Sequence, residues 1–173
     1  MMTKDRIYAL LAERALWHEI TEHPAVFNMA EVAQVPLPYP DSNAKNLFLR
    51  DDKKAHYYVV TVKGDERVNL KALRRRLSSR ALTFASNEDL ADKLGLFPGA
   101  VTPLGLLNNR DADVALYVDR RLATPDLIGL HPNDNTATVW MKTTDLMTLI
   151  REHGNPVDWV TLTDDTPEAL QLP

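Results

Sequence analysis

Short apolar segments separated by turn-forming residues are the feature of this sequence that most restricts its fold. Segments in which apolar and polar residues alternate, as in strands, are interrupted by single segments with helical periodicity. No Pro-, Gly- or Ser-rich linker divides the chain. Runs of strands broken by single helices predict one compact α+β domain with a mixed, mostly antiparallel or barrel-like sheet flanked by helices. They argue against a doubly wound parallel sheet.

Periodicity and turn residues place the expected elements. Helices are predicted at Lys4–Arg14, after the N-cap residues Asn28, Asn69 and Ser86, and at Thr144–Glu152. Strands are predicted at Leu16–Thr21, Lys45–Arg50, His56–Val62, Ala81–Ala85, Val101–Leu107, Val114–Val118 and Thr136–Met141. The polar turn 108–111 predicts a hairpin between the two strands that flank it. Three alternating prolines predict a loop over Val35–Asp41.

Length and composition bound the possible classes of protein. The 173 residues suit a single domain, which we expect to span 1–163, with a frayed tail at 164–173. No apolar run reaches the ~18 residues that a membrane span needs, and the N-terminus has no signal-peptide core. The chain has no cysteine, so disulfides, thiolate metal sites and cysteine nucleophiles are excluded. We expect a cytoplasmic protein that does not contact a membrane.

The charge of the chain is unevenly distributed. The net charge of −4 argues against broad, non-specific binding of nucleic acid, but it is compatible with a protein that touches only the end of an RNA. A basic stretch stands out against the acidic average: Lys71, Arg74, Arg75, Arg76 and Arg80 lie within ten residues. A solvated helix face is the ordinary interpretation of such a stretch, and RNA contact is the alternative.

Several common chemistries have no motif here. The chain contains neither G-x-G-x-x-G nor G-x-x-x-x-G-K-[ST], so no nucleotide-phosphate loop is predicted. Its histidines form no H-E-x-x-H or other close pair, and G-x-S-x-G is absent. We therefore expect chemistry without a metal, a cofactor or a covalent serine.

Three segments contain residue types that a purely structural role explains poorly. The first is Asn43-Ala44-Lys45-Asn46-Leu47-Phe48-Leu49-Arg50, where a lysine and an asparagine open a strand after the proline-rich loop. The second is Gly95 to Leu106, a series of glycines and prolines that contains Gly99-x-x-x-Pro103. The third is Gly129-Leu130-His131-Pro132-Asn133-Asp134-Asn135, a polar turn before a strand.

In this order and at this chain length, the segments resemble the bacterial prolyl-tRNA editing protein family. That family includes the YbaK proteins and the insertion domain of prolyl-tRNA synthetase. The resemblance runs from Glu22-His23-Pro24 through the last predicted helix, and the Lys-Asn-Leu-Phe-Leu and Gly99-x-x-x-Pro103-Leu-Gly-Leu runs are most similar to the free-standing Ala-tRNA(Pro) deacylase branch. It implies a metal-independent aminoacyl-tRNA hydrolase that removes alanine from proline tRNA. The implied partners are the acceptor end of that tRNA and, as a further candidate, prolyl-tRNA synthetase.

The resemblance also assigns the site residues. Lys45 matches the essential lysine of the family, which makes it the catalytic candidate. The substrate-binding candidates are Asn46, Arg80, Gly99, Ala100, Val101, Thr102, Pro103 and His131. Plain structural roles remain open for them: Asn46 and His131 could bond nearby backbone, and Arg80 could end its helix as an exposed charge.

The chemistry of ester hydrolysis fits these residue types. Water attack builds negative charge on the carbonyl oxygen, and the phosphate of the terminal adenosine also needs a positive partner. A lysine can act on either as a fixed cation without acting as a nucleophile. A cavity too small for the proline ring would select a small side chain. Val26, Phe27 and Met29, at and before the short helix, are predicted to form a wall or mobile lid. Cys-tRNA(Pro) or Ser-tRNA remain alternative substrates, and a non-catalytic module that binds tRNA or a synthetase remains the alternative from another class.

Overall fold

The computed structural model describes residues 1–64 and 67–162. The expected end of the domain at 163 and the tail at 164–173 lie outside these residues. The helices are α1 (Lys4–Glu13), α2 (Met29–Val32), α3 (Leu70–Leu77), α4 (Asn87–Leu94) and α5 (Thr143–His153), with 3-10 helices η1 (Pro40–Ser42), η2 (Pro103–Asn108) and η3 (Arg120–Ala123). The strands are β1 (His18–Glu22), β2 (Ala44–Asp51), β3 (Tyr57–Lys63), β4 (Leu82–Phe84), β5 (Val114–Asp119), β6 (Ile128–Leu130), β7 (Ala137–Met141) and β8 (Val157–Val160).

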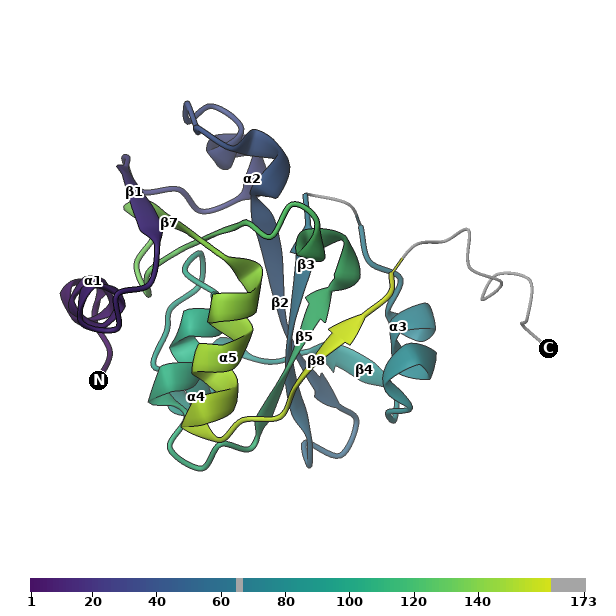
Figure 1. Ribbon diagram of the computed structural model, residues 1–173. Coiled ribbons are helices and arrows are strands. Elements are labelled where there is room, and N and C mark those ends of the chain that lie inside the picture. The colour runs from purple at the N-terminus through teal and green to yellow at the C-terminus, as the bar shows by residue number, and fades with distance from the viewer. Residues whose placement is uncertain (65–66, 163–173) are drawn as a thin grey trace.

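The strands form two sheets (Figure 1). The larger sheet has the order β4-β2-β3-β5-β8, with antiparallel pairing around β2 and parallel pairing on both sides of β5. The smaller sheet, β1-β7-β6, is antiparallel. An isolated bridge between Asn43 and Gly129 joins the start of β2 to β6. The predicted mixed, mostly antiparallel α+β domain is therefore confirmed.

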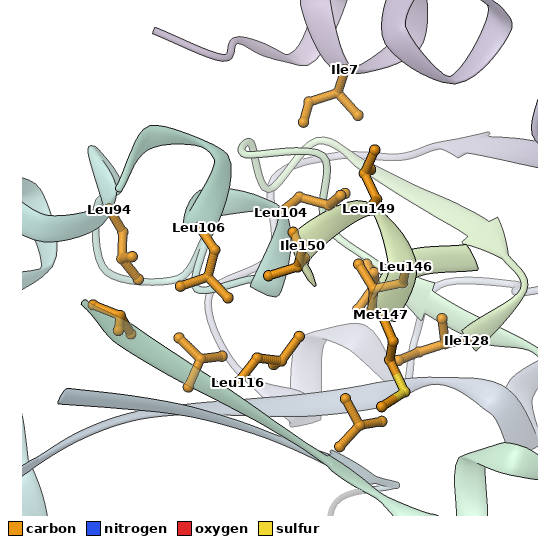
Figure 2. Close-up of a cluster of buried hydrophobic side chains, with 14 of the residues drawn as sticks. Ile7, Leu94, Leu104, Leu106, Leu116, Ile128, Leu146, Met147, Leu149 and Ile150 are labelled. Atoms are coloured by element: carbon orange, nitrogen blue, oxygen red, sulfur yellow. The ribbon is translucent and has the colours of Figure 1, made fainter. Parts of the chain in front are cut away.

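Two apolar clusters hold the helices against the large sheet. In Figure 1, α4 and α5 lie on one side of this sheet and α3 lies on the other. Figure 2 shows the main cluster, in which side chains from β5, η2, α4 and α5 meet: Leu94, Leu104, Leu106, Leu116, Leu146 and Ile150. Ile7 of α1 joins the same cluster. On the opposite face, Leu73 of α3 packs on Leu47 and Leu49 of β2.

Local capping signals agree with the helix starts. Asn69 Oδ1 accepts hydrogen bonds from two N–H groups of the first turn of α3, and Ser86 and Asp89 form a reciprocal capping box on α4. Gly95 and Gly154 end α4 and α5 in the left-handed conformation. None of the helices in the described residues is long and apolar enough to cross a membrane.

The hairpin predicted around turn 108–111 is wrong. Most of its first expected strand belongs to η2, because Pro103 has no N–H for a strand ladder and the Thr102 side chain accepts from the Leu104 N–H at the start of this helix. β5 instead pairs in parallel with β3. The strands β6 and β8, which are three and four residues long, were not predicted.

Candidate active site

A cavity of about 330 Å³ opens where the two sheets meet. Its walls come from four stretches of the chain: the segment around α2, the start of β2, the 99–101 loop, and β6 with the adjacent part of β7. The lining residues are His23, Val26, Phe27, Asn28, Val32, Val35, Leu37, Asn43, Ala44, Lys45, Asn46, Gly99, Val101, Gly129, Leu130, His131 and Thr138. Residues from all three motif segments of the sequence therefore share one cavity.

The first half of β2 supplies an open strand edge to this cavity. β4 pairs with β2 only from Leu49 onward. The Ala85 N–H donates to the Phe48 carbonyl at 3.0 Å, so the main chain of Phe48 points away from β3. Because this direction alternates along a strand, the N–H and C=O of Asn46 also point away from β3, toward the edge that β4 leaves open. Backbone donors and acceptors at this edge are available to a ligand.

Lys45 is half-buried at the start of β2, opposite Val62 of β3. Its ammonium has no hydrogen-bond or ion-pair partner within residues 1–64 and 67–162. Lysines that are withdrawn from water are usually paired. An unpaired ammonium in the wall of a cavity is therefore a natural place for a negatively charged group of a ligand.

Asn46 is fixed by its neighbour across the strand pair. The Thr61 hydroxyl donates to Asn46 Oδ1 at 2.8 Å, and Thr61 is fully buried. This bond orients the amide, because the oxygen faces Thr61 and the NH₂ group faces the other way. The expected bond to nearby backbone is therefore replaced by a bond to the Thr61 side chain, and Asn46 also lines the cavity.

His131 presents an unprotonated ring nitrogen to the site. Its Nδ1 lies 2.9 Å from the Ala137 carbonyl oxygen, which can only accept, so Nδ1 carries the proton and Nε2 is an acceptor. Burial lowers the pKa of His131 below its ordinary value, and the nearby His23 acts in the same direction. The ring is therefore neutral at neutral pH.

The glycine of the Gly99-x-x-x-Pro103 loop allows close packing against the α2 segment. Gly99 has φ +93°, and a Cβ on it would lie 3.0 Å from Cδ1 of Phe27. Val101 also lines the cavity, whereas Ala100, Thr102 and Pro103 are buried behind it. The loop therefore lines the cavity with Gly99 and Val101 and supports them with its buried residues.

The wall opposite β2 comes from the segment around α2. Val26 is buried and is held at both ends: its N–H donates to the Asn135 carbonyl at 3.2 Å, and Asn135 Nδ2 donates to the Val26 carbonyl at 2.8 Å. The α2 start is closed by two bonds, from the Glu31 N–H to Asn28 Oδ1 and from the Phe27 N–H to the Glu31 carboxylate. Met29 is the first residue of α2, but its side chain lies outside the described part of the structure.

Arg80 is the one predicted binding residue that lies far from the cavity. Its guanidinium forms an ion pair with Asp52, at 2.6 Å. Asp52 directly follows the end of β2, whereas Lys45 lies near its start. With a strand rise of ~3.3 Å per residue, the two ends are roughly 23 Å apart.

Several lining residues were not predicted as site residues. His23 Nε2 lies 3.0 Å from the Thr138 hydroxyl, and the His23 and His131 rings are 6.1 Å apart. His23 lies in the segment where the family resemblance begins, but it was not predicted as a site residue. The His-Pro dipeptide is the sequence signal that could have identified it. Thr138 belongs to a buried strand and carried no separate signal.

The composition of the cavity indicates the chemistry that it can support. One ammonium and two imidazoles line it together with apolar side chains, and its described lining contains no carboxylate. Such a site suits a ligand with an anionic group, or a reaction that develops negative charge on oxygen.

Comparison with known proteins gives the family. Residues 23–149 match the aminoacyl-tRNA editing domain family. This chain belongs to the aminoacyl-tRNA editing domain family. The matched range contains every residue that lines the cavity, so the site lies within the shared part of the fold.

Similar proteins of this family occur in bacteria and animals. The prolyl-tRNA editing protein ProX of Acetoanaerobium sticklandii is 36% identical over 155 residues, which cover 90% of this chain and 94% of ProX. The prolyl-tRNA synthetase associated domain-containing protein 1 of Bos taurus is 34% identical over 149 residues, which cover 84% of this chain and 86% of that protein. A crystal structure described as a candidate trans-editing enzyme for prolyl tRNA synthetase has a TM-score of 0.67 at 21% identity and covers 91% of this chain and 96% of its own. That structural similarity supports the fold.

Proposed function

We propose that this protein is a trans-editing deacylase that hydrolyses the ester of mischarged Ala-tRNA(Pro). Membership of the editing family and the similarity to ProX support hydrolysis of an aminoacyl-tRNA. The observation that carries the proposal is the half-buried Lys45, whose ammonium has no partner within the described part of the chain and which lines a cavity together with Asn46, Gly99 and His131.

The proposed reaction follows from the charges of the site. Water attacks the ester carbonyl, and the negative charge that develops on the carbonyl oxygen is stabilised by the Lys45 ammonium. The C–O bond to the terminal ribose then breaks, and the ribose oxygen takes up a proton as alanine leaves. With no carboxylate in the described lining, we propose that backbone groups and the free hydroxyl of the substrate's own ribose position the water.

The α-ammonium of the substrate needs acceptors. We propose that His131 Nε2 is one of them, since the other ring nitrogen donates to Ala137. The open edge of β2 and the carbonyl groups of the 99–103 loop would provide further acceptors. Asn46, Ala100, Val101, Thr102 and Pro103 would bind or support the substrate.

Selectivity would come from the size of the cavity. Its volume lies at the low end of the ~300–1,000 Å³ range of ligand pockets, and it must hold the terminal ribose as well as the amino acid. Val26, Val32 and Val101 narrow it with branched side chains. A methyl group would fit against this wall and the proline ring would clash with it.

We further propose that the reaction needs no metal. Within the described lining, two histidines are the only residues of the types that commonly bind metals, and no three or more such side chains in the described residues lie together so that they could hold a metal ion. Dialysis against a chelator should leave the deacylation rate unchanged. A rate that is lost and then restored by a divalent cation would contradict this.

A deacylation panel tests the proposed substrate directly. Proline tRNA charged with alanine, serine, cysteine or proline is incubated with the protein, and ester loss is compared with the uncatalysed rate. We expect the fastest hydrolysis for alanine and none above background for proline. Faster hydrolysis of the serine or cysteine ester would assign that ester as the substrate instead of the alanine ester. If no ester were hydrolysed faster than the uncatalysed rate, the protein would be a non-catalytic binding module. The expected partners are proline tRNA and prolyl-tRNA synthetase, in the cytoplasm.

A further inference from the structure

The helix α3 carries a basic surface that the proposed catalytic step does not use. Lys71, Arg74, Arg75 and Ser78 follow one another at helical spacing and are all exposed. Together with Ser79 they line a shallow surface hollow of about 410 Å³. We call these five residues the α3 basic face.

The packing of α3 fixes the direction in which this face points. Leu73 packs against the sheet in the cluster that contains Leu47 and Leu49, with Leu70 and Leu77 beside it. The apolar stripe of α3 therefore faces the sheet and the basic face points to solvent. In Figure 1, α3 lies on the side of the large sheet away from α4 and α5.

Lys45 belongs to the same side of the sheet as α3. Side chains alternate along β2, so Lys45, Leu47 and Leu49 share one face, and the two leucines lie under α3. The α3 basic face and the cavity lysine thus extend along one side of the molecule. A ligand that reaches Lys45 with its end can contact α3 with the part that follows.

The charge of α3 contrasts with the rest of the protein. The whole chain has a net charge of −4, whereas α3 has four basic residues and no acidic one in eight residues. Its hollow is lined by three basic side chains and two serines. Such a surface attracts a polyanion, because each phosphate that it neutralises releases bound counterions.

We propose that the α3 basic face binds phosphates of the base-paired stem that adjoins the 3′ end of the substrate tRNA. This inference rests on the proposed function, since it places the ester in the cavity and the stem against α3. Duplex RNA is recognised mainly through its backbone and 2′-hydroxyl groups, which suit lysine, arginine and serine side chains. A protein partner fits less well, because a stable protein interface has an apolar centre and the apolar residues of α3 face the sheet.

The test compares a long and a short substrate in the same variants. Lys71→Gln and Arg74→Gln are combined, because both side chains are exposed and, among the described residues, the one hydrogen bond that either side chain forms joins Arg74 Nε to the Ser79 carbonyl at 3.4 Å. Hydrolysis is measured on charged full-length tRNA and on a short aminoacyl-oligonucleotide that contains only the single-stranded 3′ end. Arg110→Gln with Lys142→Gln is the matched control, with the same loss of charge at exposed positions outside α3 and the cavity.

The expected result is selective for the long substrate. If two phosphate contacts are lost, the wild-type kcat/KM for full-length tRNA should fall about tenfold more between 50 and 200 mM salt than that of the α3 variant. The short substrate should be hydrolysed equally by the wild type, the α3 variant and the control. The variant Lys71→Arg with Arg74→Lys keeps both positive charges, so it should hydrolyse full-length tRNA at the wild-type rate.

The two proposals fail in different ways. If the wild type hydrolyses both substrates and the α3 variant matches it on tRNA at every salt concentration, the α3 inference is wrong and the proposed function stands. If the wild type hydrolyses neither substrate, the proposed function is wrong and the α3 inference falls with it. If the α3 variant keeps its rate on free tRNA but loses affinity for prolyl-tRNA synthetase, the surface binds a protein and the RNA proposal is overturned.

Discussion

At the scale of single residues, the site depends on side chains whose state is set by one neighbour. The Ala137 carbonyl oxygen decides which nitrogen of His131 carries the proton, and Thr61 decides which way the Asn46 amide faces. Lys45 has no such neighbour among the described residues. The residue kept without a partner is thus the one to which we assign the charge stabilisation.

His131 gives a prediction for pH. Burial lowers its pKa below the ordinary value, so the folded protein takes up this proton less readily than the unfolded chain. The free energy of unfolding should therefore fall as pH decreases below about 6.5. The deacylation rate should fall as well, because a protonated ring repels the substrate α-ammonium. Thermal unfolding from pH 7.5 to 5 should show a weaker pH dependence in His131→Asn, and an unchanged dependence would contradict the assignment.

Gly99 gives a prediction for packing. Gly99→Ala adds backbone strain at φ +93° and also places a methyl group 3.0 Å from the Phe27 ring. Gly64→Ala is the matched control, because Gly64 has φ +72° and no described atom within 4 Å of the added carbon. Strain alone should cost about 1–3 kcal/mol in each variant. Denaturant unfolding should show a larger loss in the free energy of unfolding for Gly99→Ala than for Gly64→Ala. Equal losses would mean that the Phe27 ring moves aside without destabilising the protein.

At the scale of elements, we propose that the wall around α2 controls which side chains enter the cavity. The prediction uses Val26→Ala, which removes two methyl groups from a buried wall residue. Deacylation of Pro-tRNA(Pro) should rise relative to Ala-tRNA(Pro) by an amount in the range of about 10–200-fold. Val160→Ala makes the same deletion in the cluster under α3 and should leave the ranking of esters unchanged. An unchanged ranking in Val26→Ala would remove this segment from selectivity.

Elements with strong local signals could be predicted from the sequence. The alternation in 45–62 predicted β2 and β3 to within one residue at each end, and the caps at Asn69 and Ser86 predicted α3 and α4. The parallel pairing of β5 with β3 could not be predicted, because it brings together segments far apart in the chain and has no turn signal. β6 and β8 are too short to show a period. The grouping of Lys45, Gly99 and His131 was expected only from the family resemblance, since no local pattern links three distant segments.

At the scale of the whole molecule, the two sheets meet where the cavity opens. Gly129 of β6 lies at this junction: it forms the bridge with Asn43, lines the cavity and packs against Trp140 of β7. A Cβ at Gly129 would lie 2.4 Å from Cζ3 of the Trp140 ring, which is fully buried. The position of the indole therefore requires glycine at this place.

The contact between Gly129 and Trp140 predicts how substitutions at this junction change the free energy of unfolding. Gly129→Ala should lower the free energy of unfolding by about 1–3 kcal/mol, because the buried indole must move. Trp140→Phe removes the ring atoms that the methyl group would meet. The double variant should therefore lose less than the sum of the two single variants in denaturant unfolding. Strictly additive losses would show that the two residues do not share this contact.

The proposed role of the Lys45 ammonium is tested most directly by the deacylation rate of Lys45→Ala on Ala-tRNA(Pro), measured alongside its unfolding curve and that of the wild type. Since this ammonium has no partner among the described residues, its removal should leave stability nearly unchanged. Loss of the cation should lower the rate by about 100-fold or more, as for removal of a single group that stabilises developing negative charge, with partial activity in Lys45→Arg. A Lys45→Ala variant that is folded and hydrolyses the ester at the wild-type rate would show that this ammonium does not stabilise the developing charge.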